Sequence, residues 1–461
     1  MDNKKPVRES TVTVSAGFII TLIYSAAFGF TLFEIYNKKL EVPPLHTGGT
    51  LSVFIYIAEI IFFMNIIGAY RIDTNRFFNI FISNVICLIM ANTMGYLELS
   101  LVNRSFLSVV PILILTCFDV IAALIWSLAA GAIYDRVVPV RDALLVYGDK
   151  LAEETVYKLL ERSDRYRITE THKYEEDENG SNIEEVEKVI SRFSTIIISR
   201  VDSSVRNDLL KFCYSHDIDV ILPPRISDIM IRGAKDLNQF DSPFIRCRNS
   251  SLSSWQLFVK RLFDIIGSLF AIILLGPLML ITALCIKLYD NGNVMFRQKR
   301  VTRDGRIFDI YKFRSMVPDA EKQGEPQKAT NDDPRITPIG KIIRRLRIDE
   351  LPQFFNILKG DMSLVGPRPE RIENCEEYER KIPEFHFRNK VKAGLTGYAQ
   401  VMGKYNTTPY DKLLLDLTYI QHFSFFLDFK ILMMTFKIVY MKESTEGFKS
   451  ETETNERKDR K

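Results

Sequence analysis

The sequence predicts a membrane protein with three parts: an α-helical four-span bundle at the N-terminus, a small α/β Rossmann-like domain, and a mainly helical C-terminal domain with a re-entrant membrane helix. Three observations lead to this prediction. Charged residues form 26% of the 461-residue chain but are almost absent from its first 135 positions. Strand and helix patterns alternate over residues 142–250. A further uncharged run, Ile265–Ile286, lies between basic flanks.

Four uncharged or nearly uncharged runs open the chain, and each reaches the roughly 20 residues that a helix needs to cross a bilayer. Basic residues beside the spans indicate the orientation, because they favour the cytosolic side. If each run crosses the membrane once, seven of the flanking Lys and Arg lie on one side of the membrane and three on the other. We therefore expect a four-helix transmembrane region over 1–141 with both ends in the cytosol. The runs are Thr11–Phe33, Thr47–Tyr70, Phe77–Leu97 and Ser105–Tyr134.

Two acidic residues, Glu59 and Asp119, lie inside the second and fourth runs. An ionisable residue within a membrane span is a functional candidate by default. The structural alternative is a protonated acid that hydrogen-bonds to a neighbouring helix, for which the runs supply Asn65, Asn84 and Asn92. We favour the structural alternative, because no series of acids typical of a transport path accompanies these two residues.

The fifth uncharged run predicts a re-entrant helix over 261–287. Its length would allow a crossing, but Gly276 and Pro277 lie at its midpoint, where proline removes a helical hydrogen bond and bends the axis. Both flanks are basic, so a crossing would leave one of them outside the cytosol. A helix that breaks at Gly276 and Pro277, dips into the bilayer and returns keeps both flanks on one side.

Residues 142–250 show short apolar strands that alternate with amphipathic helices, as in a small doubly wound α/β domain. The strand candidates are DALLVYG, STIIIS and IDVILP, and the helix candidates are EETVYKLLER, IEEVEKVISR and SSVRNDLLKFCYS. The first turn offers only Gly148-Asp149-Lys150, without a GxGxxG motif or a P-loop. The sequence therefore gives little reason to expect a nucleotide, and we interpret the domain as regulatory or as an assembly module.

A strongly basic stretch, Arg297–Arg347, contains fourteen Lys and Arg against seven Asp and Glu. One interpretation is a basic patch that holds anionic lipid headgroups. The other is a site for a polyanionic substrate presented at the bilayer surface. The two interpretations are compatible, and the sequence leaves both open.

The adjacent acids Asp349 and Glu350 are the principal catalytic candidates. We expect Asp349 to be the N-cap of a helix with Pro352 in its first turn and Gly360 after its end. The helix N-terminus and the arginines before it, among them Arg344, favour ionised carboxylates and also attract phosphate. One acid would face a phosphorus atom while its neighbour holds a metal ion, for which Mg²⁺ is suited because it needs few protein ligands. The alternative is that the pair simply caps the helix.

Three further motifs supply candidates for phosphate or substrate binding. In VGPRPE, two prolines stiffen the loop around Arg368, whose guanidinium can bind phosphate with two hydrogen bonds. In IYKFRSM, Lys312 and Arg314 would share one face of a strand. In KAGLTGYAQ, two glycines around a threonine give a backbone suited to close approach by a ligand. The candidates in this loop are Gly394, Thr396, Gly397 and Gln400.

The stretch from about Lys260 to Lys442 resembles the bacterial sugar transferase family, the monotopic phosphoglycosyl transferases. The resemblance rests on KRLFDIIGSLFAIILLGPLMLITAL, FRQKRVTRDGRIFDIYKFRSM, DELPQFFNILKGDMSLVGPRP and VKAGLTGYAQV, which occur in the family's order. With the membrane runs and the Rossmann-like segment in front, the chain is similar to the large form of the family, the polyprenyl glycosylphosphotransferases. This implies a phosphoglycosyl transferase catalytic domain over 255–442.

The resemblance implies transfer of a sugar 1-phosphate from a UDP-sugar to polyprenyl (undecaprenyl) phosphate, on the cytosolic face of the bacterial inner membrane. This is the first membrane step of surface polysaccharide synthesis. In the family the aspartate of the Asp-Glu pair is the nucleophile, here Asp349, which forms an aspartyl phosphosugar and releases UMP. Glu350 matches the family's magnesium-binding carboxylate. Lys312, Arg344 and Arg368 match basic positions that neutralise phosphates.

Four positions depart from the family's usual pattern. Gly276 stands where serine often precedes the kink proline, Tyr398 where tryptophan is common, and Met402 and Lys404 where asparagine and arginine are common. The first departure leaves the proline in place. The others lie where substrate contacts are expected, so they put the identity of the sugar in doubt rather than the reaction.

Two alternative functions remain: a membrane hydrolase of nucleotide sugars, and a non-enzymatic scaffold or regulator of polysaccharide assembly. The implied partners are a UDP-sugar, polyprenyl phosphate and the lipid bilayer, while a second copy of the chain and other polysaccharide-assembly proteins are left open. The sequence shows no nucleic-acid-binding motif and no CxxC pair, which argues against nucleic acid and against a zinc site. The tail over 443–461 is highly charged, and we expect it to be disordered.

Overall fold

The structure, a computed structural model, divides the chain into two compact units, Met1–Pro224 and Arg225–Lys461, the latter referred to as the C-terminal unit. The predicted tail over 443–461 and the predicted helix EETVYKLLER lie outside the described residues. The structure describes residues 5–38, 46–70, 72, 77–138, 140–148, 166–174, 182–237, 242–247, 252–317, 333–403 and 407–439.

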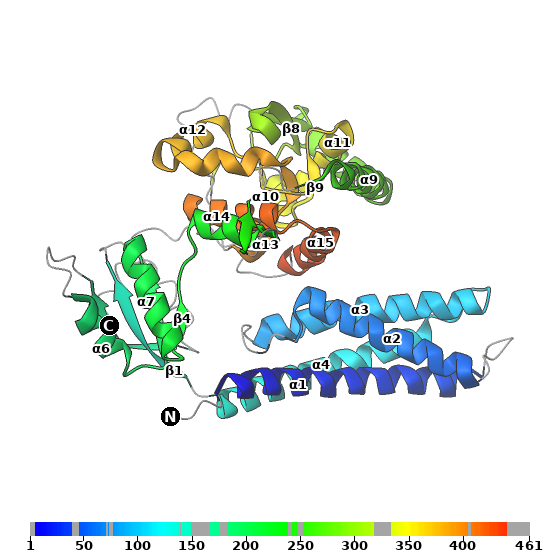
Figure 1. Cartoon of the computed structure of the whole chain (residues 1–461). Coiled ribbons are helices and arrows are strands. Elements are labelled where there is room, and N and C mark those ends of the chain that lie inside the picture. The colour runs from blue at the N-terminus through cyan, green and yellow to red at the C-terminus, as the bar shows by residue number, and fades with distance from the viewer. Residues whose placement is uncertain are drawn as a thin grey trace. The chain divides into compact units, whose positions relative to one another are not determined.

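Long apolar helices form the first part of the chain, drawn as a bundle in Figure 1. α1 (Lys5–Phe30) continues into a π-helical segment, η1 (Thr31–Tyr36), and α2 (His46–Ile67), α3 (Phe77–Val102) and α4 (Val110–Val137) follow. Each of the four long helices is apolar enough to cross a membrane. The uncharged runs of the sequence therefore form helices, as predicted.

Polar groups inside this bundle connect neighbouring helices. Asp119 of α4 is fully buried, and one of its carboxylate oxygens accepts a hydrogen bond from Asn92 of α3 at 3.1 Å. The hydroxyl of Tyr56, on α2, donates to the same asparagine. The predicted hydrogen bond between Asp119 and an asparagine on a neighbouring helix is thus present, and the structural role of Asp119 stays a prediction. For Glu59, Oε2 has no hydrogen-bond partner in the part of the chain that the structure describes.

A four-stranded parallel sheet follows, with the strand order β2-β1-β3-β4. The central strands β1 and β3 are buried and apolar, as predicted for strands covered on both faces. The edge strand β2 is mostly exposed and polar, so it gave no apolar signal in the sequence. The elements are β1 (Arg141–Tyr147), β2 (Tyr166–Lys173), α6 (Asn182–Ile190), β3 (Thr195–Ser199), α7 (Ser203–Ser215) and β4 (Asp219–Ile221).

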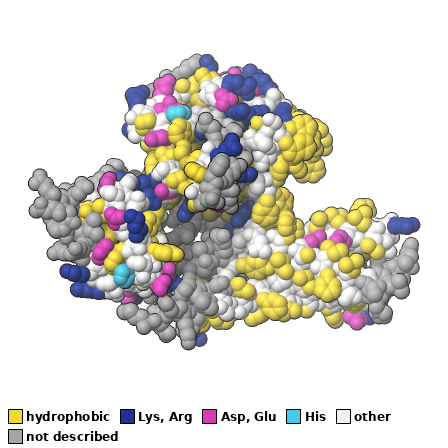
Figure 2. Space-filling view, in the orientation of Figure 1, with side chains coloured by type: hydrophobic (Ala, Val, Ile, Leu, Met, Phe, Trp, Pro, Cys, Tyr) yellow, Lys and Arg dark blue, Asp and Glu magenta, His cyan; other side chains and the backbone are white. Residues whose placement is uncertain are grey.

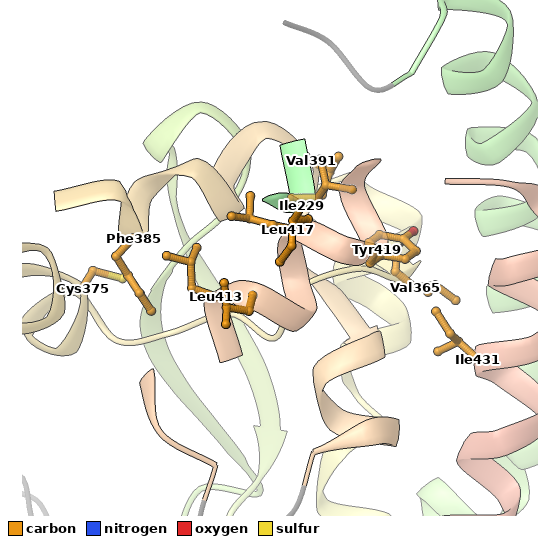
Figure 3. Close-up of a cluster of buried hydrophobic side chains, with 11 residues drawn as sticks. Ile229, Val365, Cys375, Phe385, Val391, Leu413, Leu417, Tyr419 and Ile431 are labelled. Atoms are coloured by element: carbon orange, nitrogen blue, oxygen red, sulfur yellow. Dashed lines mark hydrogen bonds between the residues drawn. The ribbon is translucent and has the colours of Figure 1, made fainter. Parts of the chain in front are cut away.

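The C-terminal unit begins earlier than the predicted domain boundary at residue 250. α8 (Ile226–Arg232) packs against α14 (Pro409–Gln421), and its Ile229 is buried in the hydrophobic cluster drawn in Figure 3. A short antiparallel pair, β5 (Lys235–Leu237) and β6 (Phe244–Arg246), follows. Its sequence lacks a long apolar run, which explains why the boundary was not visible in the sequence.

α9 (Ser254–Asp290) is a single helix of 37 residues. Its backbone stays helical through Gly276 and Pro277, so the predicted break does not interrupt the helix. The helix continues because its inner face packs on the same unit on both sides of the proline. Ile272 contacts the cluster around Phe354, and residues after the proline contact a second cluster, which includes Ile343.

Both ends of α9 are attached to the C-terminal unit. Lys260, near its start, forms an ion pair with Asp428, and Asp290, at its end, forms one with Arg314. A crossing helix would carry one end to the far side of the bilayer, whereas these attachments hold both ends on one folded body. They argue against a crossing, and the re-entrant placement stays a prediction. Figure 2 shows hydrophobic side chains over α9, and those exposed include Phe258, Leu262, Phe263, Ile266, Leu269, Phe270, Ile273, Leu274, Leu280 and Ile281.

Short elements make up the rest of the C-terminal unit. β7 and β8 form an antiparallel hairpin, and β9 pairs in parallel with β10. The helices α12 to α15 surround the cluster of Figure 3, where Leu413, Leu417 and Tyr419 of α14 lie at the centre. The elements are β7 (Met295–Val301), η2 (Arg303–Gly305), β8 (Ile307–Phe313), α10 (Pro338–Arg345), η3 (Ile348–Glu350), α11 (Gln353–Lys359), β9 (Ser363–Val365), α12 (Ile372–Lys381), η4 (Pro383–Lys390), β10 (Gly394–Thr396), α13 (Tyr398–Met402), α14 and α15 (Phe425–Val439).

Candidate active site

The acids Asp349 and Glu350, the carboxyl pair, lie in the 3-10 turn η3 between α10 and α11. Arg347, just before the turn, adopts a left-handed backbone conformation with a φ of 54°, which redirects the chain after α10. For a residue with a side chain this conformation is uncommon and is often found at functional sites. The turn thus places the two carboxylates between the ends of two helices.

The prediction that Asp349 is the N-cap of α11 is wrong. The N-cap is Pro352, and α11 begins one residue later. Before the proline, a backbone N–H donates its hydrogen bond to the carbonyl three residues earlier, as Leu351 N–H does to Ile348 at 3.1 Å. This is the 3-10 pattern, so the α-helix starts only after the proline. Gly360 ends α11 with a φ of 96°, as predicted for a residue that must be left-handed.

Glu350 is held by two cations. Lys312 Nζ donates to its Oε1 at 3.1 Å, and Arg368 Nη2 donates to the same oxygen at 2.7 Å. Burial alone would raise the pKa of Glu350, but the charges of Arg368 and Lys312 lower it well below its ordinary value. Glu350 is therefore a carboxylate at every physiological pH.

Asp349 differs from its neighbour. Among the described residues, its carboxylate forms no hydrogen bond and no ion pair, although Lys312, Arg344 and Arg368 act on it through their charges. Burial and the negative charge of Glu350 raise the pKa of Asp349 to about 6. A carboxylate with a raised pKa is more basic than an ordinary aspartate, and without a partner it is free to react.

Three of the four predicted phosphate-binding residues lie around the turn, and one does not. The charges of Lys312, Arg344 and Arg368 all lower the pKa of Asp349, and those of Lys312 and Arg368 also lower the pKa of Glu350. Arg314 instead pairs with Asp290 at the end of α9. Lys312 lies in β8, whereas Arg314 lies beyond its last residue, so the alternation of side chains along a strand does not extend to the arginine.

The glycines of the predicted ligand loop pack against another backbone segment, and substrate binding by this loop stays a prediction. A Cβ on Gly394 would lie 2.1 Å from the backbone nitrogen of Gly366, and one on Gly397 would lie 2.1 Å from the Gly366 carbonyl oxygen. The close approach that these glycines permit is therefore made by another backbone segment. The Gly394 N–H donates to the carbonyl of Pro367 at 2.9 Å, which fixes the loop that presents Arg368.

The two remaining loop candidates also make contacts within the protein. The hydroxyls of Thr396 and Thr435 share a hydrogen bond of 2.7 Å, which joins β10 to α15. Gln400 donates from Nε2 to the carbonyl of Leu395 at 3.3 Å, and its Oε1 is buried without a partner among the described residues. Both contacts stabilise the segment that supports the Arg368 loop.

Arg388 is a site residue that the sequence did not reveal. It is 4% exposed, and its Nη2 donates to the backbone carbonyl of Arg368 at 2.8 Å while pairing with Asp416 at 2.8 Å. Arg388 thus holds the backbone of Arg368, the residue that contacts Glu350. No spacing in the sequence marks this role, because the three segments meet only in the folded chain.

Replacing Gly394 by alanine is expected to destabilise the protein, because the new Cβ would lie against the backbone of Gly366. Such overpacking typically costs roughly 1–3 kcal/mol. Scanning fluorimetry in detergent should show a melting temperature several degrees below that of the wild type. Gly276→Ala is the matched control: it has open space around the new Cβ and lies in a helix, where alanine is favoured. Equal melting temperatures for the two variants would contradict the backbone contact.

Comparison with known proteins identifies relatives of the C-terminal unit. A family model described as "Bacterial sugar transferase" matches residues 255–442. The chain is 48% identical over 185 residues to the UDP-N-acetylgalactosamine-undecaprenyl-phosphate N-acetylgalactosaminephosphotransferase of Aeromonas hydrophila, which covers 40% of this chain and 44% of that protein. It is 38% identical over 221 residues to the UDP-glucose:undecaprenyl-phosphate glucose-1-phosphate transferase of Escherichia coli strain K12, covering 47% of each.

A shorter relative is matched over nearly its whole length. The chain is 40% identical over 187 residues to the exopolysaccharide production protein PSS of Rhizobium leguminosarum bv. phaseoli, covering 39% of this chain and 94% of that protein. By contrast, the chain spans less than half the length of the Aeromonas and Escherichia proteins. The shared part contains the carboxyl pair and its cations, and the chain belongs to the bacterial sugar transferase family.

Proposed function

We propose that this chain is a polyprenyl-phosphate sugar-1-phosphate transferase, which moves a sugar 1-phosphate from a UDP-sugar to polyprenyl phosphate and releases UMP. One observation carries the proposal: an unpartnered, partly neutralised carboxylate, Asp349, lies beside a glutamate that two cations keep ionised. The printed names of the Aeromonas and Escherichia relatives support this class of reaction. The sugar and the polysaccharide that receives it stay open.

In the first proposed step, the Asp349 carboxylate attacks the phosphorus that carries the sugar. A new oxygen–phosphorus bond forms, and the bond from that phosphorus to the bridging oxygen breaks, so UMP leaves with that oxygen and its electron pair. In the second step, a phosphate oxygen of polyprenyl phosphate attacks the aspartyl phosphosugar, and the carboxylate of Asp349 leaves. Two displacements with a good leaving group in each replace one difficult transfer.

The cations around the pair would stabilise the charge that develops on the phosphates. Lys312, Arg344 and Arg368 lie within electrostatic reach of Asp349, in a site from which water is partly excluded, where such charges act strongly. Because Lys312 and Arg368 also contact Glu350, their orientation is fixed before substrate arrives. The same residues would hold the diphosphate of the donor in line with the attacking carboxylate.

The donor set also fits a magnesium ion. Both hydrogen bonds to Glu350 fall on Oε1, which leaves its Oε2 and the Asp349 carboxylate as hard oxygen donors. Among the described residues there is no group of three or more His, Cys, Asp or Glu that could hold a metal. Mg²⁺ does not need one, since it commonly uses one or two carboxylates together with substrate phosphates. We assign Glu350 as the ligand, and the bound ion would neutralise charge on the donor diphosphate.

The long apolar helices support a membrane location, where a polyprenyl acceptor would reside. We propose that the membrane is the bacterial inner membrane and that the C-terminal unit faces the cytosol, since the basic flanks of the helices favour that side. The exposed apolar face of α9 would bring the carboxyl pair to the level of the lipid phosphate. This would be the first membrane step of surface polysaccharide synthesis.

The proposal is tested with the full chain, purified in nanodiscs and supplied with Mg²⁺, polyprenyl phosphate and a panel of UDP-sugars. We expect UMP release with one sugar, matched mole for mole by lipid-linked product. UMP release without lipid-linked product would show a hydrolase instead. A folded protein that releases no UMP from UDP-glucose, UDP-galactose or their N-acetylated derivatives would contradict the proposal.

The raised pKa of Asp349 predicts a pH dependence for the first step. Attack needs the ionised carboxylate, so the rate should be constant at high pH and fall as the pH drops through about 6. A group with this pKa is roughly 90% ionised at pH 7 and roughly 10% at pH 5. Single-turnover UMP release without polyprenyl phosphate measures this step alone. A rate that is unchanged down to pH 5 would contradict the assignment.

A further inference from the structure

A second group of cations lies away from the carboxyl pair, around Lys392. This lysine is half-buried, and burial together with the nearby charges of Arg261, Arg306 and Arg303 lowers its pKa. Like charges of four side chains therefore face one another at one place. Such an arrangement is unfavourable unless anions compensate it, and the carboxylates of Asp264, Asp304 and Asp361 compensate part of it.

Two of these cations lie next to Gly360. A Cβ on this glycine would lie 3.4 Å from Arg261 Nη2 and 3.7 Å from Lys392 Nζ. Because both nitrogens lie within 4 Å of this one point, they are at most about 7 Å apart (3.4 plus 3.7). This separation allows two oxygens of one phosphate group to contact both side chains.

The acidic residues nearby compensate only part of this positive charge. Asp361 pairs with Arg306 at 3.0 Å and with Lys359 at 3.3 Å. Asp264 accepts hydrogen bonds from the Ser363 hydroxyl and the Leu364 N–H. Lys392 itself forms no hydrogen bond and no ion pair among the described residues, so a positive charge is left over.

The group is separate from the carboxyl pair. Arg306 precedes the first residue of β8, whereas Lys312, which contacts Glu350, lies near the other end of this strand. At roughly 3.3 Å per residue, the strand places the two side chains about 20 Å apart. Gly360 likewise ends α11, while the carboxyl pair precedes its start.

We propose that Lys392, Arg261, Arg303 and Arg306 bind the phosphate of an anionic membrane lipid. Arg261 lies on α9, next to the exposed apolar side chains of Phe258, Leu262 and Ile265, so the cations lie beside the hydrophobic surface of that helix. Figure 2 shows Lys and Arg side chains gathered over β8 beside this surface. A phosphate attached to acyl chains satisfies both features, since its charge meets the cations while its chains meet α9.

The test measures binding to the full chain in detergent, without turnover, so it does not depend on the proposed reaction. The probes are a short-chain phosphatidylglycerol, the matching phosphatidylcholine and inorganic phosphate, each titrated by microscale thermophoresis. Lys392→Gln should weaken phosphatidylglycerol binding about tenfold, as for the loss of one charge-assisted contact. Lys381→Gln is the control, because Lys381 is an exposed lysine paired with Glu377 on α12. It should bind as the wild type does.

A second variant keeps the test decisive if Lys392→Gln proves unstable. Arg303 and Arg306 are substantially exposed, at 41% and 59%, so the double variant Arg303→Gln, Arg306→Gln should fold and should also bind phosphatidylglycerol more weakly. Equal phosphatidylglycerol binding by all variants would overturn the site. If inorganic phosphate bound as tightly as phosphatidylglycerol, the bound phosphate group would not need to come from a lipid, and the proposal would be overturned. Equally tight binding of phosphatidylcholine would overturn it as well, because the site would not select an anionic lipid.

Discussion

Asp349→Asn is expected to abolish UMP release with every UDP-sugar, with a loss of roughly 10³-fold or more, as is usual when a covalent nucleophile is removed. Asparagine has the shape of aspartate but no negative charge with which to attack phosphorus. The change should leave the fold intact, because the Asp349 carboxylate forms no hydrogen bond and no ion pair within the described residues. The variant therefore separates loss of chemistry from loss of structure.

The same variant tests the covalent intermediate directly. Wild-type protein incubated with a radiolabelled UDP-sugar, without polyprenyl phosphate, should retain one labelled phosphosugar per chain, and Asp349→Asn should retain none. Asp309→Asn is the matched control, since this exposed aspartate on β8 is outside the carboxyl pair and should be labelled like the wild type. Label that persists in Asp349→Asn, at the wild-type level, would exclude Asp349 as the nucleophile.

The sequence predicted those parts of the fold that depend on local pattern. The four uncharged runs became α1 to α4, and the apolar runs at β1 and β3 became buried parallel strands, because the periodicity of apolar residues reflects which faces are covered. Gly360 ended α11 for a local reason, its left-handed backbone. The polar edge strand β2 and the early start of the C-terminal unit lacked such a pattern and were not foreseen.

The candidate site was predicted in its chemistry but not in its geometry. Lys312 and Arg368 could be proposed from residue type, yet their common target, Oε1 of Glu350, depends on contacts between segments far apart in the sequence. For the same reason Arg314 was misplaced, since its partner Asp290 is not near it in the chain. Arg388 has no local signature, because it acts on the backbone of Arg368.

Arg368→Lys is expected to lower the rate of UMP release by roughly 30- to 100-fold, which corresponds to about 2–3 kcal/mol for a charge-assisted contact that is lost or weakened. Lysine keeps the positive charge but is shorter and cannot present a planar fork. Prolines on both sides of the arginine and the support of Arg388 hold its backbone in place, so the loop cannot move to compensate. Arg380→Lys, on the exposed face of α12, is the matched control and should release UMP at the wild-type rate.

The pH dependence shows whether Arg368 acts on the carboxyl pair or only binds substrate. Its charge lowers the pKa of Asp349 and of Glu350. Removal of the charge in Arg368→Met should therefore move the acidic limb of the single-turnover profile to higher pH, because Asp349 then holds its proton more tightly. Arg368→Lys, which retains a charge at the same place in the chain, should move it less. A binding role alone would raise the KM for the UDP-sugar and leave the limb at about pH 6 in both variants.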